Sequence, residues 1–394
     1  MLVLLLACTL PCGPGTHING GTCVGNTIGD SGASDSGGDT DTDSDTDTDT
    51  DTDTDTDTSA GCTVSTDGTA PYSTIQDAVD AASDGDTITV CAGSYDRVAI
   101  DRTTVSLVGA GEDVTTITGT SSHAAIEASE ASDLAISGFT LTGTGPSGGA
   151  AALYLDDCTG TVTDVRVADI TGTLGNDGVR VISGSVTFER MLFEDNKAMN
   201  ALLMVLSGGT DVLRHSIFRN NGYDGAGGML LVAAGGTNTE VSNNLFEENA
   251  AAGVSALVVV STGTVAYNNV FYDSPTSAYW TETLYPVEAD SGSTFMNNIA
   301  SGCYICMSLT GSGADYNIAY GSGREGYVLY QPSHDAGSHN LTTDPLFSDP
   351  ASGDYSLTAF SPAVDGGNPA AAYDDVDGSR NDMGVFGGPG GSGW

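Results

Sequence analysis

The chain has 394 residues, of which 52 are acidic and 10 are basic, so its formal net charge is −42. All ten basic residues and 40 of the acidic ones follow an acidic segment near the N-terminus, which leaves that larger part of the chain near −30. A field of this sign repels polyanions and lowers their encounter rate, which excludes nucleic acid and disfavours acidic polysaccharides as partners.

The N-terminal sequence MLVLLLACTL places Leu5, Leu6 and Ala7 directly before Cys8. This string resembles a bacterial lipobox in which Cys8 carries the lipid, and the resemblance associates Thr9 with outer-membrane retention. The apolar run is too short to cross a bilayer as a helix, and no Lys or Arg precedes it. We expect a location in the bacterial cell envelope or outside the cell, with the lipid as the only membrane contact. The alternative is a chance string before a cysteine.

Cys12 and Cys23 bracket a Gly-rich loop that a disulfide would close, and the one His between them leaves too few ligands for zinc. Residues 25–59 follow as a linker with Asp at every second position from Asp39 to Asp57. One face is wholly anionic and neither is apolar, so we expect disorder and an extended tether. A glycosylated stalk and a weak calcium-binding segment are the alternatives, although the repeat lacks the Gly of an ordered calcium loop.

A folded domain is predicted from about residue 60. Ser73 and Gln76 match a capping box, and a short helix should end at Gly85. Its apolar positions at helical spacing are Ile75, Ala78, Val79 and Ala82. Cys62 and Cys91 are expected to pair across this helix, which suits an oxidising compartment.

Three versions of one phrase then follow each other between Ser185 and Asn249: VTFERMLFEDN, VLRHSIFRNN and VSNNLFEEN. Each is a short apolar strand that ends in an Asn turn. Repeats of roughly 20 to 50 residues are typical of a solenoid, and the residue types favour a β unit. The apolar anchors of the repeat are Phe139, Val167, Leu192, Ile217, Leu245, Val270, Ile299 and Ile318.

Like residues of neighbouring coils should lie about 4.8 Å apart and form ladders. This spacing predicts an internal stack of Phe193, Phe218, Phe246 and Phe271. Asn can occupy the left-handed backbone region, so Asn ladders are expected at the corners. The two Asn sets are Asn196, Asn221 and Asn249, and Asn244, Asn269, Asn298 and Asn317.

The repeats, the preceding segment APYSTIQDAVDAASDGDTITVCAGSYDRVAI and the ending DPLFSDPASGDYSLTAFSPAVDGGNPAAAYDDVDGSRNDMG resemble the right-handed parallel β-helix, or pectin-lyase-like, family over about residues 62–388. The resemblance implies an all-β solenoid whose open N-terminal end is plugged by the short helix, with a closing segment from about residue 341. It is specific for fold and poor for function, because this fold carries lyases, hydrolases, adhesins and inert stalks.

One strand of each coil is apolar at successive positions, as in Leu202–Leu206, Met229–Val232 and Leu257–Val260. A strand with one face in water should alternate. We therefore expect a loop or a second subunit to cover this strip, the latter giving a homo-oligomer. An exposed apolar binding strip is the alternative.

Nine of the fifteen Tyr lie between Tyr267 and Tyr330. Such rings stack on sugar faces, although Tyr also simply suits strands. Tyr279 and Trp280 lie in the longest repeat step, where a functional loop would be inserted. The candidates for glycan binding are Tyr279, Trp280, Tyr285, Tyr304, Tyr327 and Tyr330.

Cys303 and Cys306 form a CYIC motif, for which a local disulfide or two packed thiols is preferred over redox chemistry because no helix N-terminus is expected there. Cys158 is left unpaired and is expected to be buried.

Catalysis on a polyuronate would require a cation, or calcium, beside a base. The best such cluster is Lys197, Arg214 and His215, with Arg219 and the acidic Glu194 and Asp195 nearby. A ladder of surface ion pairs is the preferred interpretation. Calcium could bind Asp374, Asp375 and Asp377, but a polar turn is preferred.

The sequence therefore predicts a signal remnant at residues 1–8, a Cys-bracketed loop at 9–24, a linker at 25–59 and a β-helix at 60–394. The expected function is non-catalytic: a lipid-anchored surface protein that binds neutral glycan or contacts a cell-surface partner. No cofactor is expected, with calcium as the alternative. The competing function is that of a polysaccharide lyase or glycoside hydrolase.

Overall fold

The structure is a computed structural model, and it describes residues 16–19, 22–25, 61–145, 149–170, 177–197, 201–206, 209–222, 229–234, 238–249, 256–260, 263–272, 285–289, 292–303, 306–309, 313–321, 329–330 and 337–394. The chain divides into two units, residues 1–56 and 57–394. In the first unit, β1 (Thr16–Asn19) and β2 (Thr22–Gly25) form an antiparallel hairpin. Cys8, Cys12 and the linker lie outside the described residues, as does the side chain of Cys23.

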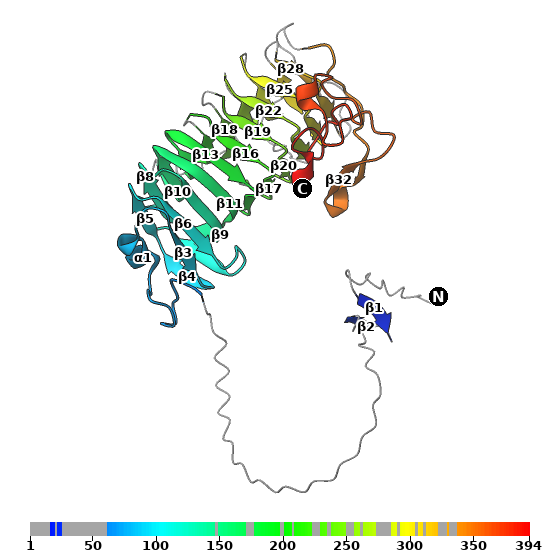
Figure 1. The fold of residues 1–394 in the computed structure, drawn as a ribbon. Helices are drawn as coiled ribbons and strands as arrows, with labels where there is room; N and C mark the ends of the chain where they lie inside the picture. The colour runs from blue at the N-terminus through cyan, green and yellow to red at the C-terminus, as the bar shows by residue number, and fades with distance from the viewer. Residues whose placement is uncertain are drawn as a thin grey trace, which may run out of the picture. The chain divides into compact units, whose positions relative to one another are not determined.

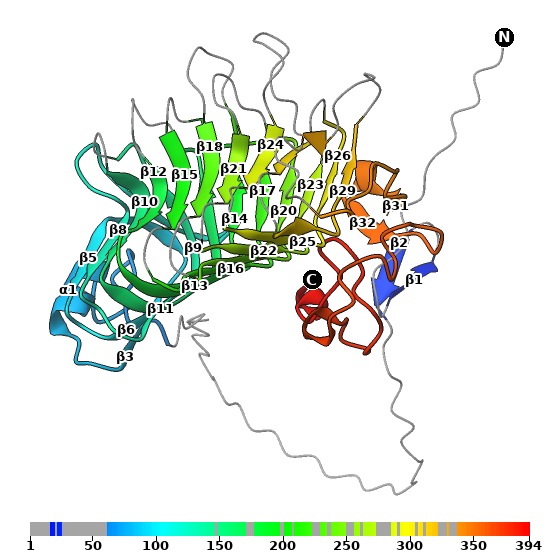
Figure 2. The ribbon, with the colours of Figure 1, turned by 90° about the horizontal axis from the view of Figure 1, so that it is seen from above.

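The second unit is a solenoid of parallel strands, as the repeats predicted (Figures 1 and 2). One sheet takes a strand from each of ten coils, and its strands pair in register with their neighbours. They are β5 (Val98–Asp101), β8 (Ile126–Ser129), β10 (Ala150–Asp156), β12 (Asp177–Val181), β15 (Ala201–Leu206), β18 (Met229–Ala234), β21 (Ala256–Val260), β24 (Tyr285–Ala289), β27 (Met307–Leu309) and β30 (Leu329–Tyr330).

The other two strands of each coil form two further parallel ladders, which join because β9 (Leu134–Thr142) and β11 (Cys158–Ala168) run through both. One ladder also holds β3 (Asp86–Val90), β6 (Val105–Gly109), β13 (Gly184–Glu189), β16 (Val212–Arg214), β19 (Glu240–Ser242), β22 (Val265–Tyr267), β25 (Thr294–Met296) and β28 (Ala314–Asp315). The other holds β4 (Gly93–Asp96), β7 (Thr115–Thr118), β14 (Leu192–Glu194), β17 (Ile217–Arg219), β20 (Leu245–Glu247), β23 (Val270–Tyr272), β26 (Ile299–Ser301) and β29 (Ile318–Tyr320).

Where these two ladders meet, the chain turns sharply at one residue with positive φ, between 51° and 74°. This left-handed conformation suits Gly and Asn and is costly for bulky side chains. We call the set the corner column: Gly138, Asp164, Arg190, His215, Asn243, Asn268, Asn297 and Tyr316. The column matters below because the end of the chain lies on it.

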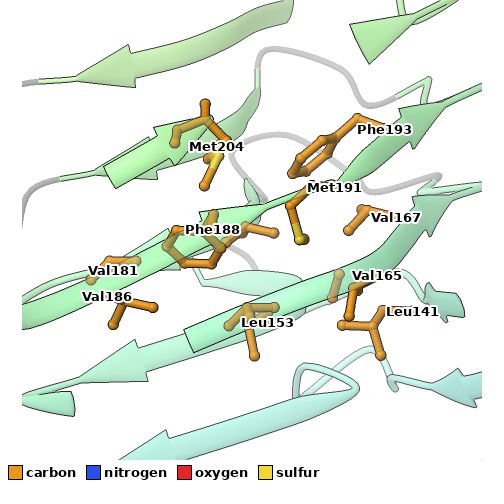
Figure 3. Close-up of a cluster of buried hydrophobic side chains, with 14 of the residues drawn as sticks. Leu141, Leu153, Val165, Val167, Val181, Val186, Phe188, Met191, Phe193 and Met204 are labelled. Atoms are coloured by element: carbon orange, nitrogen blue, oxygen red, sulfur yellow. The ribbon is translucent and has the colours of Figure 1, made fainter. Parts of the chain in front are cut away.

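The interior confirms the predicted aromatic stack. Phe193, Phe218, Phe246 and Phe271 are buried. The ring centroids of successive members of this stack lie 4.3, 4.7 and 4.8 Å from each other. Figure 3 shows the start of this stack, where Phe193 packs above Val167 and beside Met191. Coil spacing thus fixes ring spacing, as expected for like residues in adjacent turns.

The register corrects two of the predicted anchors. From Leu192 onward each anchor pairs with the next, but Leu192 itself pairs with Arg166, and Arg166 pairs with Thr140. Val167 and Phe139 are therefore each one residue out of register. A shift of one residue moves a side chain to the opposite face of the strand: Val167 and Phe139 point inward, whereas Leu192 and its successors point outward.

Both Asn ladders are present, but their backbone differs from the prediction. Asn269 accepts hydrogen bonds from the backbone and side-chain nitrogens of Asn244 (3.0 Å each) and donates to Asn298 Oδ1 (2.9 Å). The left-handed residue is the one that precedes each ladder residue, such as Asn268 or Asp195. The ladder Asn side chains are buried and bond from coil to coil. Those of Asn269, Asn298 and Asn317 also donate to the carbonyl oxygen two residues earlier in their own turn, at 2.9 to 3.1 Å.

A short helix and a disulfide close the N-terminal end. Helix α1 (Ile75–Ala81) buries Ile75, Ala78 and Val79 beside β3 and β5. Its N-cap is Thr74, which accepts from Asp77 N, so the predicted capping box is displaced by one residue. Gln76 instead bonds both backbone groups of Ala99 in β5 (2.8 and 3.1 Å), which pairs the exposed edge of the first coil.

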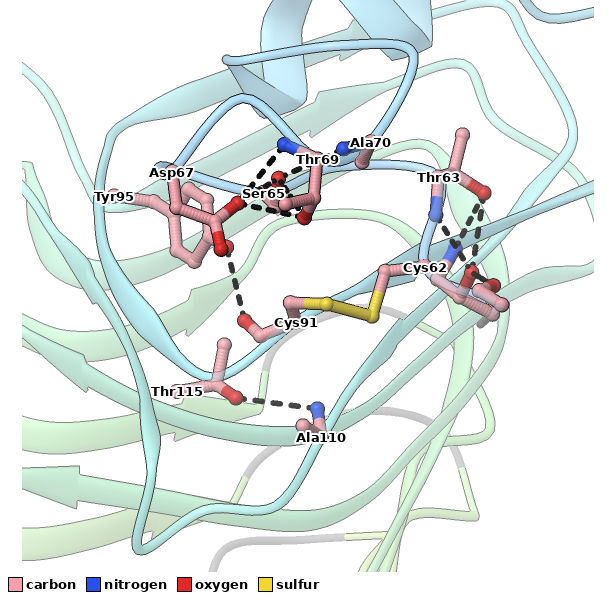
Figure 4. The surroundings of a disulfide bond; sticks show 12 residues. Cys62, Thr63, Ser65, Asp67, Thr69, Ala70, Cys91, Tyr95, Ala110 and Thr115 are labelled. Atoms are coloured by element: carbon pink, nitrogen blue, oxygen red, sulfur yellow. Dashed lines mark hydrogen bonds between the residues drawn. A yellow bond between two sulfur atoms is a disulfide. The ribbon is translucent and has the colours of Figure 1, made fainter. Parts of the chain in front are cut away.

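The expected disulfide between Cys62 and Cys91 is formed (Figure 4). Beside it, Thr63 N and Val64 N donate to Thr89 O, and Cys91 N donates to Val64 O. These backbone hydrogen bonds hold the entry segment, the residues around Cys62–Val64, against β3. Cys303 and Cys306 also form a disulfide, whereas Cys158 is a free, buried thiol whose pKa is raised by burial.

The closing segment, residues 341–394, contains the antiparallel hairpin β31 (Phe347–Asp349) and β32 (Asp354–Leu357). It covers the outer face of the ladder that holds β20, β23, β26 and β29, which we call the third ladder. A second apolar core lies beneath the closing segment. Its buried members are Leu245, Val270, Ile299 and Ile318 from the coils and Tyr355, Ala363, Met383 and Val385 from the closing segment.

On the strip predicted to need a cover, Leu203, Met204 and Leu206 are buried and Val205 is half-buried. The side chains of Met229–Val232 and Leu257–Val260 lie outside the described residues.

Candidate functional site

The candidate catalytic cluster is only partly assembled. Arg214 and His215 lie at the end of β16, and both bond the carboxylate of Glu189 from the preceding coil, at 3.3 and 3.2 Å. Arg190 approaches the same carboxylate at 3.3 Å. Burial opposes ionisation of Glu189, but Arg214, His215 and Arg190 outweigh it and hold the pKa of this carboxyl below its ordinary value. Glu189, not Glu194, is therefore the acidic partner of His215.

His215 cannot reach a ligand in this structure. The residue is 9% exposed, and its Nε2 lies 2.8 Å from the carbonyl oxygen of Gly390 in the closing segment. Its Nδ1 faces Glu189, so both ring nitrogens are occupied. A general base needs a free nitrogen within reach of substrate, so His215 acts structurally here.

The second half of the cluster is an ion-pair ladder, as the sequence predicted. Glu194 is bridged by Arg166 from one neighbouring coil (2.5 Å) and Arg219 from the other (2.6 Å). Burial alone would raise the pKa of Glu194, and the two guanidinium groups lower it. Lys197 is exposed and forms no ion pair with any residue that the structure describes.

The acidic candidates in the closing segment form a turn. Asp375 accepts hydrogen bonds from the backbone N–H of Asp382 and of Gly388, at 3.1 and 2.5 Å, and Asp377 accepts from Ser379. Asp374 makes no such contact in the described segment. Within the described ranges, no group of three or more His, Cys, Asp or Glu side chains is arranged to hold a metal ion.

The candidate glycan-binding aromatics cannot be placed. Tyr279, Trp280, Tyr304 and Tyr327 lie outside the described residues, as do the side chains of Tyr285 in β24 and Tyr330 in β30. The described Tyr residues of this region join the coils to the closing segment instead. The edge-to-face pairs are Tyr267 with Tyr373 and Tyr272 with Tyr355 and Phe347.

A polar row on the ten-stranded sheet was missed at the sequence level. Glu127, Tyr154 and Arg180 occupy successive positions of one outward ladder. Arg97 (2.7 Å) and His123 (3.1 Å) both bond Glu127. Burial first, then Asp156, raises the pKa of Tyr154. The available signal was the spacing of 27 and 26 residues between the three ladder positions, which matches the repeat.

The last coil carries a second missed group. His339 stacks on Tyr316 with ring centroids 4.5 Å apart, and its Nδ1 lies 2.8 Å from Asp315. The His339 side chain is 57% exposed, so this oriented imidazole faces solvent. Arg380 lies 5.8 Å from the Tyr316 ring. No periodicity marks His339, because it lies in the closing connection and not in a repeat.

Residues 124–283 match the family described as right handed beta helix region. The match and the coiled parallel strands agree: over residues 124–283 the chain has the right-handed β-helix repeat. Comparison with curated protein sequences gave no match.

Several solved structures are similar, and three of them are named here. They are pectate lyase Pel9A (15% identity, TM-score 0.42, 80% of this chain and 91% of that chain), an alginate lyase from Paenibacillus (14%, 0.36, 68% and 94%) and a mannuronan C-5 epimerase A-module from Azotobacter vinelandii (16%, 0.29, 68% and 94%). At these identities no residue role is carried over. Among the described residues, no helix is long and apolar enough to span a membrane.

Proposed function

We propose that this protein is a cell-envelope β-helix protein that binds polysaccharide without cleaving it. One observation carries the proposal: each of the seven arginines from Arg97 to Arg219 forms an ion pair with a carboxylate, and His215 is covered. Cleavage of an acidic polysaccharide would need a cation and a base that lie side by side and are free to face the substrate. In the candidate cluster Lys197 is exposed and without an ion pair among the described residues, but the base that would act beside it, His215, is covered. The exposed imidazole of His339 bonds Asp315 in the last coil, and no Lys or Arg forms an ion pair with that carboxylate among the described residues.

The charge supports a neutral glycan. With 40 acidic and 10 basic residues after the linker, the domain is near −30, and seven of its nine arginines form ion pairs with carboxylates of the domain. An acidic chain would approach against this field, whereas a neutral one would not. The aromatic candidates from Tyr279 to Tyr330 remain the proposed contacts, and Cys8 remains the proposed lipid anchor with the linker as its tether. Self-association through the apolar strip also remains a prediction.

The test uses the full chain with Cys8→Ser, incubated with neutral and acidic polysaccharides with and without calcium. We expect retention on at least one neutral glycan, and neither new reducing ends nor absorbance from unsaturated products. Trp280→Ala should abolish retention, whereas Phe360→Ala, a change at a side chain on the closing segment, should not. Cleavage of any member would establish the competing function and direct attention to His339, Tyr154 and Glu127.

The anchor is tested separately in bacteria that express the native chain. The wild-type protein should fractionate with membranes and Cys8→Ser should be released. Equal release of both would refute lipidation at Cys8.

A further inference from the structure

The end of the chain lies along the corner column. We call residues 382–394 the strap. Asn268 Nδ2 donates to Asp382 O and Gly384 O (2.7 and 3.1 Å), and Asn243 Nδ2 donates to Val385 O and Gly387 O (2.9 Å each). The strap thus runs back over successive coils. Two contacts hold its tip: His215 Nε2 with Gly390 O, and Trp394 Nε1, which donates to Asn243 O at 2.9 Å.

His215 faces a hydrogen-bond acceptor at each ring nitrogen. Gly390 O is a carbonyl oxygen, and Glu189 Oε1 belongs to a carboxylate with a lowered pKa. Neutral imidazole has one N–H and can donate to only one of them, whereas imidazolium donates to both. Both contacts can therefore be hydrogen bonds at the same time only when the ring carries two protons.

The charged groups around the ring come from the coils alone. Glu189 lies at the end of β13, Arg190 precedes His215 in the corner column, and Arg214 is its chain neighbour. The strap from Gly387 to Trp394 reads GGPGGSGW and has no ionisable side chain. One other titratable group contacts this part of the strap: Asp375, whose pKa is raised by burial, accepts from Gly388 N–H at 2.5 Å. Protonation of Asp375 in acid would weaken that hydrogen bond, so its effect on the strap is opposite in sign to that of His215.

The fit at the tip is close. A Cβ on Gly393 would lie 2.2 to 2.5 Å from three atoms of the His215 ring, and one on Gly390 would lie 2.5 Å from Asn243 Oδ1. The strap backbone is thus pressed against the imidazole, and the position cannot take a side chain without movement.

The strap nevertheless leaves some buried polar atoms of the corner column without a hydrogen-bond partner. Asn243 Oδ1 and Asn297 Nδ2 are buried and have no hydrogen-bond partner among the described residues. A buried amide atom without a partner is unfavourable, because it has lost water and gained nothing. The docked strap therefore competes with a hydrated column, which is the condition for a reversible contact.

We propose that the strap is a pH-sensitive latch that His215 holds when its ring carries two protons and releases when the ring loses one. After deprotonation, a lone pair on one nitrogen faces either Gly390 O or Glu189, and one hydrogen bond becomes a repulsion. Histidine changes charge near neutral pH, so the latch is closed in mildly acidic and open in mildly alkaline solution.

Release would uncover His215 together with the amides of Asn243 and Asn268. A row of amides offers both donors and acceptors, which is the chemistry that recognises the hydroxyl groups of a neutral glycan. This consequence rests on the proposed function, whereas the latch itself does not.

Hydrogen exchange of the full chain, followed by mass spectrometry and corrected for intrinsic rates, tests the latch. Protection of peptides from residues 385–394 should fall by about tenfold or more between about pH 5.5 and about pH 8.5, while that of β11 to β13 is unchanged. His215→Gln should remove the pH response, and Gly393→Ala should lower protection at both pH values. His123→Gln changes a His that bonds Glu127 and serves as the matched control; it should respond as the wild type does.

Equal strap protection at both pH values in the wild type, or a wild-type response in His215→Gln, would overturn the latch. Glycan retention is measured on the same samples and on a chain that ends at Gly387. Retention that rises with strap release supports the amide row as a glycan site. If the strap responds to pH but retention does not, the row is not the site; if no form binds any glycan, the proposed function fails and the latch stands.

Discussion

Single side chains in this domain act through their copies in the next coil. Phe218 lies between Phe193 and Phe246 in the interior stack, and each of its faces contacts another ring. The same holds for Asn269 between Asn244 and Asn298. A substitution at one level therefore affects two neighbours at once.

We expect Phe218→Ala to lower the free energy of unfolding by about 3–5 kcal/mol, the usual cost of removing a buried Phe. Denaturant unfolding followed by circular dichroism measures it. Phe360→Ala is the control: this ring is 91% exposed, and its loss should change stability by no more than about 0.5 kcal/mol. If the two substitutions lower the free energy of unfolding by similar amounts, the ring stack does not stabilise the domain more than an exposed ring does.

A pH effect is expected at the base of the strap. Burial, and then the charge of Asp375, raise the pKa of Asp382 despite a hydrogen bond from the Asp365 N–H. The folded state thus holds this proton more tightly than the unfolded chain, so stability is lost as pH rises through the raised pKa. Asp382→Asn should therefore raise the melting temperature relative to wild type more at pH 7 than at low pH.

Asp377 provides a control of opposite sign. Ser379 lowers the pKa of this exposed carboxyl, so its contribution to stability is present above its unfolded pKa and is lost as pH falls. Asp377→Asn should lower the melting temperature near pH 7 and have less effect in acid. Thermal scans at a series of pH values compare the two; parallel curves for both variants would contradict the assignments.

The Asn pairs show what the sequence can predict at this scale. Both ladders and the Phe stack could be predicted, because each needs only residue type and period. The left-handed positions could not, because the corner often carries two adjacent Asn, as in Asn243–Asn244 and Asn268–Asn269, and both are suited to that backbone. Burial decides between them: the second points inward to the ladder and the first turns the chain.

At the scale of elements, the two ends are closed in different ways. The N-terminal end has a helix, a Gln76 contact with the edge of β5, and a covalent link to β3. The C-terminal side has a segment that packs sideways on the third ladder and ends in the strap. The resemblance predicted both closures, but not which sheet the closing segment would cover.

We expect Cys62→Ser with Cys91→Ser to lower the free energy of unfolding by about 3–4 kcal/mol, from the loop entropy of a cross-link that spans 29 residues. Thermal unfolding with and without reductant measures the loss. Reductant should bring the wild type to the value of the double variant. If the wild type and the double variant are equally stable without reductant, the entry segment is held by its backbone hydrogen bonds to Thr89 alone. Loosening of the entry segment should also increase aggregation, because it exposes a strand edge.

The site was less predictable than the fold. The sequence brought Arg214 and His215 together, and Glu189 lies 26 residues before His215, about one coil, so this partner could have been found from the repeat. The cover by Gly390 depends on a contact 175 residues away. Such a contact has no period and no motif. His339 was not predicted as a site residue for the same reason.

At the scale of the whole molecule, charge is the dominant feature. With 40 acidic and 10 basic residues after the linker, the folded state brings many like charges together. Salt screens their repulsion with a Debye length of about 10 Å at 0.1 M, so the melting temperature should rise between low salt and about 0.3 M sodium chloride. Sodium and potassium chloride should act alike; a fall in the melting temperature would mean that the arginine ladders outweigh the general repulsion.

The regular ladders have a consequence for how such a chain can change over time. Between Leu192 and Ile217 one coil spans 25 residues, and loss of residues 193–217 would join Leu192 to Phe218, which occupies the place of Phe193 one coil below. Phe would still meet Phe and Asn would still meet Asn. Gene duplication or loss in units of one coil can therefore lengthen or shorten the domain without a new fold, whereas an insertion of any other size must be absorbed in the loops.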